Sequence, residues 1–182
     1  MTYYGGKELA AAFRTVRSNT IKAAEEIPED KYSFRAAEGT RSVAELLAHI
    51  AFGAAFHKEI TLKGRNNLDG FDFMSFMGGV AAQTKTPRSK AELVALLKTE
   101  GENFATSLEG LSEDFLQQVV TFPEGANPPS RTRFDMLLSA KEHEMHHRGQ
   151  LMLLQRMIGI KPHLTRANEE RMAAMQAQAG KQ

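Results

Sequence analysis

Three of the six histidines in this 182-residue chain fall within five consecutive positions, in the stretch KEHEMHHRGQ at residues 141–150. His143 and His147 are four residues apart, a spacing that places Cβ atoms about 5–6 Å apart on one face of a helix. Imidazole nitrogens bind divalent metals, with Zn–N distances of about 2.0–2.1 Å. The spacing therefore indicates two ligands of one metal ion. His146 lies about 100° from His147 on such a helix and is poorly placed to join them.

Hydrophobic periodicity predicts a helix from about Thr132 to Ile158, closed by Gly159 and then Pro162. His143 and His147 fall in the middle of its apolar stripe, which also contains Met136, Ala140, Leu151, Leu154 and Ile158. Burying two imidazoles without partners costs free energy, and a shared metal ion would remove that cost. The alternative is that the histidines are ordinary hydrogen-bonded core residues.

A third ligand is expected from another helix. Ser42 and Glu45 form a capping-box pattern, and the helix that they begin is predicted to run to about Gly64. His49 lies on its inward stripe, which also carries Glu45, Leu46, Gly53, Phe56 and Ile60. Gly53 would leave room for an ion or a substrate. Glu45 would either orient the imidazole or simply cap the helix.

Residues 143–147 also match the H-E-x-x-H signature of zinc proteases, with Glu144 as general base. Glu169 or Glu170 would then be the third ligand. The match is short enough to arise by chance on a charged helix, and the sequence supplies no sheet to align a peptide substrate. We therefore rank a zinc protease below a helical metal centre.

The composition, 42% hydrophobic and 25% charged with a formal net charge of +1, is that of an ordinary globular protein. It offers no basic patch for nucleic acid. The absence of cysteine excludes disulfides, thiolate ligands and cysteine nucleophiles, so a metal must be held by His, Asp or Glu. No secretory signal and no apolar run of about 20 residues is found. We expect no nucleic-acid or membrane partner and a cytoplasmic location.

Helical spacing extends through nearly the whole chain. Further long helices are predicted at residues 7–27, ended by Pro28, and at 89–111, begun by a second capping box. Shorter helices are expected within 65–87, as a lid, and at 165–178, whereas the proline-containing segment 119–130 is expected to be an extended loop. The predicted fold is an all-α four-helix bundle in one domain, 1–182, with a core at about 5–160 and an extension at 161–182.

Two motifs together resemble a known family. AELLAHI at 44–50 and HEMHHRGQLMLLQRMIG at 143–159 are similar to the corresponding helices of the DinB/YfiT-like superfamily of four-helix-bundle metalloproteins. The resemblance covers roughly residues 5 to 160. It implies a divalent metal ion, zinc or nickel most often, bound by His49, His143 and His147, with water or substrate completing the coordination. It also implies a homodimer.

Members of this family with known activities include enzymes that transfer bacillithiol or use mycothiol, and proposed hydrolases. An open three-histidine site would lower the pKa of bound water or thiol towards neutrality. We therefore expect a metal-dependent thiol S-transferase or hydrolase with a small-molecule substrate. Because the chain has no cysteine, any thiolate must come from a cosubstrate, such as a low-molecular-weight thiol. The alternative is a non-catalytic helical bundle that binds a small molecule or a partner.

The residues that follow His147 have plainer interpretations. Arg148 lies about 100° from the histidine stripe, which favours an ion pair over anion binding. Gly149 is expected to permit close helix approach. Gln150, within about 60° of His147, would bind a ligand or tie helices together.

Two further histidines are not expected to bind the metal. His57 lies about 80° from His49 on the predicted helix, and His163 follows the Gly-Pro break and is expected to be exposed. In the lid segment, ordinary core packing is favoured over an apolar entrance for Phe71, Phe73, Phe76 and Met77.

Overall fold

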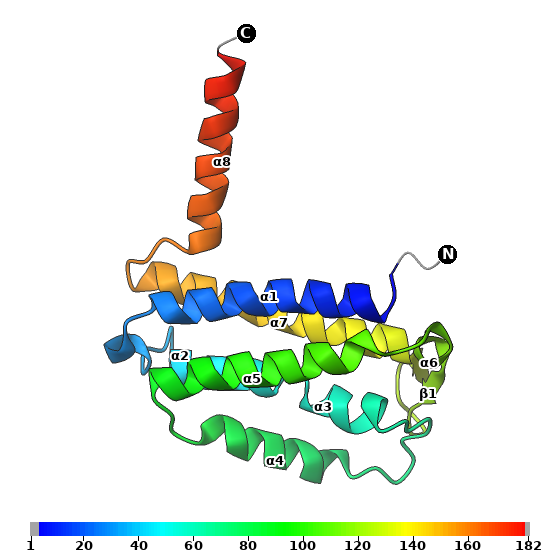
Figure 1. Cartoon of the computed structure of the whole chain (residues 1–182). Coiled ribbons are helices and arrows are strands. Elements are labelled where there is room, and N and C mark those ends of the chain that lie inside the picture. Colours follow the sequence, from blue (N-terminus) through cyan, green and yellow to red (C-terminus); the bar gives the residue numbers. More distant parts are fainter. Residues whose placement is uncertain (1–3, 181–182) are drawn as a thin grey trace.

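The computed structural model describes residues 4–180, so the outermost residues of the predicted domain, 1–3 and 181–182, lie outside the described residues. The elements are α1 (Gly6–Glu26), the 3-10 turn η1 (Glu29–Lys31), α2 (Val43–Phe52), α3 (Ala55–His57), the π-helical turn η2 (Lys58–Leu62), α4 (Phe73–Lys85), α5 (Lys90–Glu109), α6 (Glu113–Gln117), β1 (Val119–Thr121), β2 (Ser130–Thr132), α7 (Arg133–Met157) and α8 (His163–Ala179). Helices α1, α2, α5 and α7 form a bundle (Figure 1), which confirms the predicted all-α architecture.

The bundle is held together by apolar stripes that face inward. Helix α1 packs along α5 and α7, and α2 packs against the same two helices. Three clusters of buried side chains fill the interior of the described residues, one around Leu47, Ile50 and Leu97, one around Phe13 and Phe104, and a smaller one around Ile60 and Met136. Fully burying such a side chain stabilises the fold by about 1.5–3 kcal/mol. The periodicity of the sequence therefore determines which helix faces meet.

Capping boxes begin two of the bundle helices where the sequence predicts them. The Glu45 backbone N–H donates to Ser42 Oγ at 3.2 Å, and the Ser42 N–H donates to Glu45 Oε2 at 2.9 Å. Ser89 and Glu92 make the same reciprocal pair at the start of α5. Each cap satisfies two backbone donors that the first turn leaves without partners. The cap on α2 fixes the helix that carries His49.

The second predicted helix is broken, so its predicted continuity to Gly64 is wrong. Helix α2 ends at Phe52, and the chain continues through Gly53 into α3 and the π-helical turn η2. A Cβ atom at position 53 would lie 2.8 Å from Nδ1 of His143. The break therefore coincides with the point where a side chain of α7 packs directly on the backbone of the second helix.

Segment 119–130 is not simply an extended loop, which corrects the prediction. Its ends form a short antiparallel hairpin in which Val119 pairs with Thr132 and Thr121 with Ser130. The prolines lie in the connection between the strands, where they remove no hydrogen bond from the ladder. The hairpin lies beside the start of α7, which follows β2 directly (Figure 1).

Helices α4 and α8 lie outside the four-helix bundle. Helix α4 packs against α2, where a short extra helix was expected, and α8 projects away from the bundle (Figure 1). The C-terminal helix begins at His163, earlier than predicted. His163 is only 5% exposed, and its Nε2 lies 3.2 Å from Asn19 Oδ1, so its predicted exposure is wrong. Within residues 4–180, no helix has the length and apolar character needed to span a membrane.

Candidate metal centre

The structure brings His49, His143 and His147 together from two helices. Nε2 of His49 lies 3.0 Å from Nε2 of His147 and 3.1 Å from Nε2 of His143. One nitrogen atom from each ring lies within 4.8 Å of the other two. Three imidazoles on α2 and α7 thus direct the same ring atom to one point in the bundle.

These contacts cannot all be ordinary hydrogen bonds. His49 Nε2 faces two other Nε2 atoms, yet one ring nitrogen offers either one proton or one lone pair. In a tetrahedral zinc site with Zn–N bonds of about 2.05 Å, neighbouring nitrogens are about 3.3 Å apart. The two separations from Nε2 of His49, 3.0 and 3.1 Å, are slightly shorter than that value. The three residues therefore fit a divalent ion held by histidine nitrogens.

Burial keeps all three imidazoles neutral at physiological pH. It lowers the pKa of His49 to about 3, with a further contribution from the positive charge of Arg41. It also lowers the pKa of His143 to about 4, and it lowers that of His147. A neutral imidazole is the form that binds metals, because its lone pair is free. The site is therefore ready to coordinate an ion without first losing protons.

Gln150 orients one of the three rings. Its Oε1 lies 2.8 Å from Nδ1 of His147, so the Nδ1–H group donates to the amide and Nε2 keeps its lone pair. Nε2 of Gln150 lies 3.2 Å from Nε2 of His146, outside the cluster. Gln150 thus contacts two histidines of its own helix and does not tie two helices together, whereas its predicted contact with a ligand stays a prediction.

The space next to Gly53 is occupied by the imidazole ring of His143 and is not available to an ion or a substrate, contrary to the prediction. A Cβ atom at this position would lie 2.8 Å from Nδ1 and 2.9 Å from Cε1 of His143. Nδ1 of His143 is buried and has no hydrogen-bond partner among residues 4–180. The absence of a side chain at residue 53 therefore sets how closely His143 approaches α2.

Glu144 is not the base of a zinc protease. Both its carboxylate oxygens accept from Nε of Arg17, at 2.9 and 3.0 Å, and the two side chains are 2% and 5% exposed. Arg17 also donates to the carbonyls of Leu97 and Ile50. Glu144 thus tethers α7 to α1 inside the bundle. Because its carboxylate is already paired, the H-E-x-x-H interpretation fails.

The other acidic candidates are also engaged elsewhere. Glu169 pairs with Lys161 at the base of α8, and neither Glu169 nor Glu170 belongs to the histidine cluster. Glu45 accepts two hydrogen bonds from Arg35, at 2.6 and 2.7 Å, in addition to its capping role. Of its two predicted roles, Glu45 therefore caps α2 and does not orient His49.

Three neighbouring residues lie apart from the cluster. Gly149 is exposed, and a Cβ atom there would have no neighbour within 4 Å, so the expected close helix approach is wrong. Arg148 is half-buried and forms no ion pair with a described residue, contrary to the favoured interpretation. His57 is buried, which lowers its pKa to about 4, and it lies outside the three-histidine group.

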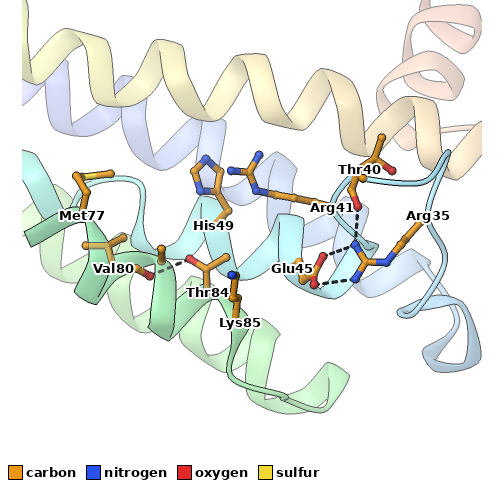
Figure 2. A pocket seen from close by; sticks show the side chains of 11 residues that line it. Arg35, Thr40, Arg41, Glu45, His49, Met77, Val80, Thr84 and Lys85 are labelled. Atoms are coloured by element: carbon orange, nitrogen blue, oxygen red, sulfur yellow. Dashed lines mark hydrogen bonds and ion pairs between the residues drawn. The ribbon is translucent and has the colours of Figure 1, made fainter. Parts of the chain in front are cut away.

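A cavity of about 360 Å³ opens beside His49, between α2 and α4 (Figure 2). Its apolar wall is formed by Met77, Val80 and Ala81, and Arg41 lies at the His49 end. Periodicity could not reveal Arg41, because the residue precedes the helix and its position depends on the loop before α2. Among the lid residues, Met77 thus lines a cavity, whereas Phe71 and Phe76 are half-buried against Phe56, as favoured. Phe73 also contacts Phe56 but is 48% exposed, so core packing is the wrong prediction for this residue.

The chain is similar to bacterial proteins of known structure. It is 29% identical over 152 residues to the protein described as uncharacterized protein YjoA of Bacillus subtilis, covering 84% of this chain and 90% of YjoA. The crystal structure of YjoA, a DinB-like protein, superposes with a TM-score of 0.62 and covers 84% of this chain and 92% of that one.

A second solved structure shares the fold. YfiT of Bacillus subtilis, described as a probable metal-dependent hydrolase with an unusual four-helix bundle topology, superposes with a TM-score of 0.65 at 15% identity. The match covers 88% of this chain and 91% of YfiT. The sequence pattern of the DinB superfamily matches residues 12–151, which include all three clustered histidines. The chain therefore belongs to the DinB superfamily.

Proposed function

We propose that His49, His143 and His147 hold one divalent metal ion and that the chain is a metal-dependent hydrolase of a small molecule. The observation that carries this proposal is the approach of three Nε2 atoms to 3.0 and 3.1 Å. Support comes from YfiT, which shares the fold and is described as a probable metal-dependent hydrolase. Zinc and nickel are the proposed ions, because both suit imidazole ligands.

The ion would supply Lewis acidity and would lower the pKa of a bound water or thiol. The chain's own residues would prepare the site. Gln150 holds His147 in the tautomer that leaves Nε2 free, and Gly53 admits the His143 ring. The cavity beside His49 would bind the substrate, with Met77 and Val80 excluding water from one side.

A thiol S-transferase is the second candidate, carried over from the family resemblance. The same neutral three-histidine site would bind and activate a thiol, and the chain has no cysteine of its own. The thiol would then be a low-molecular-weight cosubstrate. We also propose a homodimer, which light scattering of the purified protein would test.

The test compares the wild type with His147→Ala and with the control His146→Ala, after removal of metal by a chelator and readdition of zinc or nickel. Release of the alcohol from an ester substrate is measured with and without a small thiol. We expect zinc-dependent or nickel-dependent turnover in the wild type and the control, and none in His147→Ala. A requirement for the thiol would identify the transferase. Turnover that survives complete metal removal would contradict both candidates.

A further inference from the structure

Arg41 stands beside the three histidines, although it belongs to no helix. It is the residue before the N-cap Ser42, and its side chain points toward the His49 imidazole (Figure 2). Arg41 and His49 also line the same cavity between α2 and α4. The guanidinium group therefore lies beside the His49 imidazole, at the histidine end of that cavity.

The guanidinium has no partner within the described part of the chain. None of its nitrogens makes a hydrogen bond or an ion pair with residues 4–180, although a guanidinium carries five N–H donors. Among the described residues, the only carboxylate lining the cavity belongs to Glu45, and both its oxygens accept from Arg35. Since Arg35 and Glu45 neutralise each other, Arg41 and Lys85 are the remaining charged residues of the cavity lining, and Arg41 is the one beside His49.

The backbone on both sides of Arg41 is anchored. The carbonyl of Thr40 accepts from Arg35, and Thr40 Oγ1 donates to the Ala37 carbonyl at 2.7 Å. On the other side, the Ser42 N–H donates to Glu45 at 2.9 Å. A side chain that starts from a fixed backbone loses less entropy when it binds a ligand. The loop thus positions Arg41 for a contact that no described residue provides.

Charge determines what kind of ligand would complete the contact. A divalent ion at the three neutral histidines would be repelled by the guanidinium, and an anion placed between them would remove this repulsion. The planar fork of arginine matches the two oxygens of a carboxylate. Along the rest of the cavity, Met77, Val80 and Ala81 offer an apolar wall. The site therefore combines an anion-binding end with an apolar side, in a volume suited to a small molecule.

We propose that Arg41 binds the carboxylate of the small-molecule ligand, whose apolar part packs against α4. This inference rests on the proposed function, because it places the ligand at the metal centre. It adds the substrate class, small apolar carboxylates, and a specificity-determining residue.

The experiment uses the protein loaded with cobalt(II), whose visible absorption reports ligands near the ion. Cobalt content is measured first, and hexanoate and inorganic phosphate are then titrated separately. The variants are Arg41→Met, Arg41→Lys and Lys85→Met. Lys85 is the matched control, because it is a cation that lines the same cavity from the end of α4, whereas Arg41 lies beside His49.

We expect Arg41→Met to keep one cobalt ion per chain and to bind hexanoate about 10- to 100-fold more weakly than the wild type. Arg41→Lys retains the positive charge but not the planar guanidinium, so its affinity for hexanoate should lie between those of the wild type and Arg41→Met. Lys85→Met should stay within about 3-fold of the wild type. Removing the repelling charge should also make Arg41→Met bind cobalt more tightly than the wild type does.

The outcomes of this experiment distinguish a failure of the proposed metal centre from a failure of the inference about Arg41. A wild type that binds no stoichiometric cobalt overturns the proposed function, and the inference with it. Full cobalt loading with equal hexanoate affinity in wild type and Arg41→Met overturns the inference alone. So does an equal loss in Lys85→Met, a failure of the wild type to bind hexanoate, or a clear preference for phosphate over hexanoate.

Discussion

Gly53→Ala is expected to damage metal binding without unfolding the bundle. The added Cβ would lie 2.8 Å from Nδ1 of His143, whereas ordinary van der Waals contact begins at 3.4 Å. The ring must therefore move by about 0.6 Å, because a close-packed interior leaves no free space. Metal–ligand distances tolerate deviations of only about 0.2 Å. His143 would then no longer reach an ion held by His49 and His147.

The expected loss of zinc affinity is at least about 100-fold, or about 2.7 kcal/mol, since disturbing even the partners of metal ligands costs about 10- to 100-fold. The backbone at Gly53 has φ −57° and ψ −26°, which alanine adopts without strain. Replacing glycine by alanine where the backbone angles allow it stabilises a protein by about 0.4–1 kcal/mol, and this offsets part of the free energy lost when the ring is displaced. The free energy of unfolding of the metal-free protein should therefore change less than the zinc affinity.

Gly149→Ala is the matched control on α7. A Cβ atom at Gly149 meets nothing within 4 Å, so this variant should keep wild-type zinc affinity and gain up to about 1 kcal/mol of stability. Zinc affinity is measured by competition with a chromophoric chelator, and stability by urea denaturation of the metal-free proteins. Zinc affinity of Gly53→Ala within 2-fold of the wild type would refute the reasoning.

Three further predictions concern the interior of the bundle. Glu144→Gln leaves the buried Arg17 charge uncompensated and should lower the free energy of unfolding by about 3 kcal/mol or more; a change below 1 kcal/mol in urea denaturation would contradict this. Gly101→Ala places a Cβ atom 2.6 Å from Cγ of Arg17 and should cost about 1–3 kcal/mol in the same assay; wild-type stability would show that Arg17 is free to move. Folding lowers the pKa of His143 from 6.5 to about 4, so the unfolded chain binds more protons between these values. The free energy of unfolding of the metal-free protein should therefore have its full value above about pH 6.5 and fall as the pH drops toward 4. This fall should be shallower in His143→Phe, and the same pH dependence in both proteins would contradict the assignment.

Local signals in the sequence account for much of the fold. Ser42 with Glu45 and Ser89 with Glu92 predict where α2 and α5 begin, because a capping box is a contact between residues three apart. Periodicity likewise predicts which faces of α2 and α7 turn inward. That His49 and His143 lie on such faces follows from spacing alone.

Contacts between distant segments account for what the sequence did not predict. The break at Gly53 coincides with the packing of a ring from α7, and the role of Glu144 depends on Arg17, which is 127 residues away. Arg41 lies in a loop, where no hydrophobic periodicity indicates which way its side chain points. His163 follows a proline and was expected to be exposed, but it is covered because its partner Asn19 stands on α1. Each of these positions is decided by tertiary packing.

A crystal structure of the zinc-loaded protein, with anomalous data collected on both sides of the zinc absorption edge, tests the metal centre most directly. We predict one anomalous peak per chain, about 2.0–2.1 Å from Nε2 of His49, His143 and His147. Three rings still in mutual contact, with no peak between them in crystals grown with excess zinc, would contradict the account.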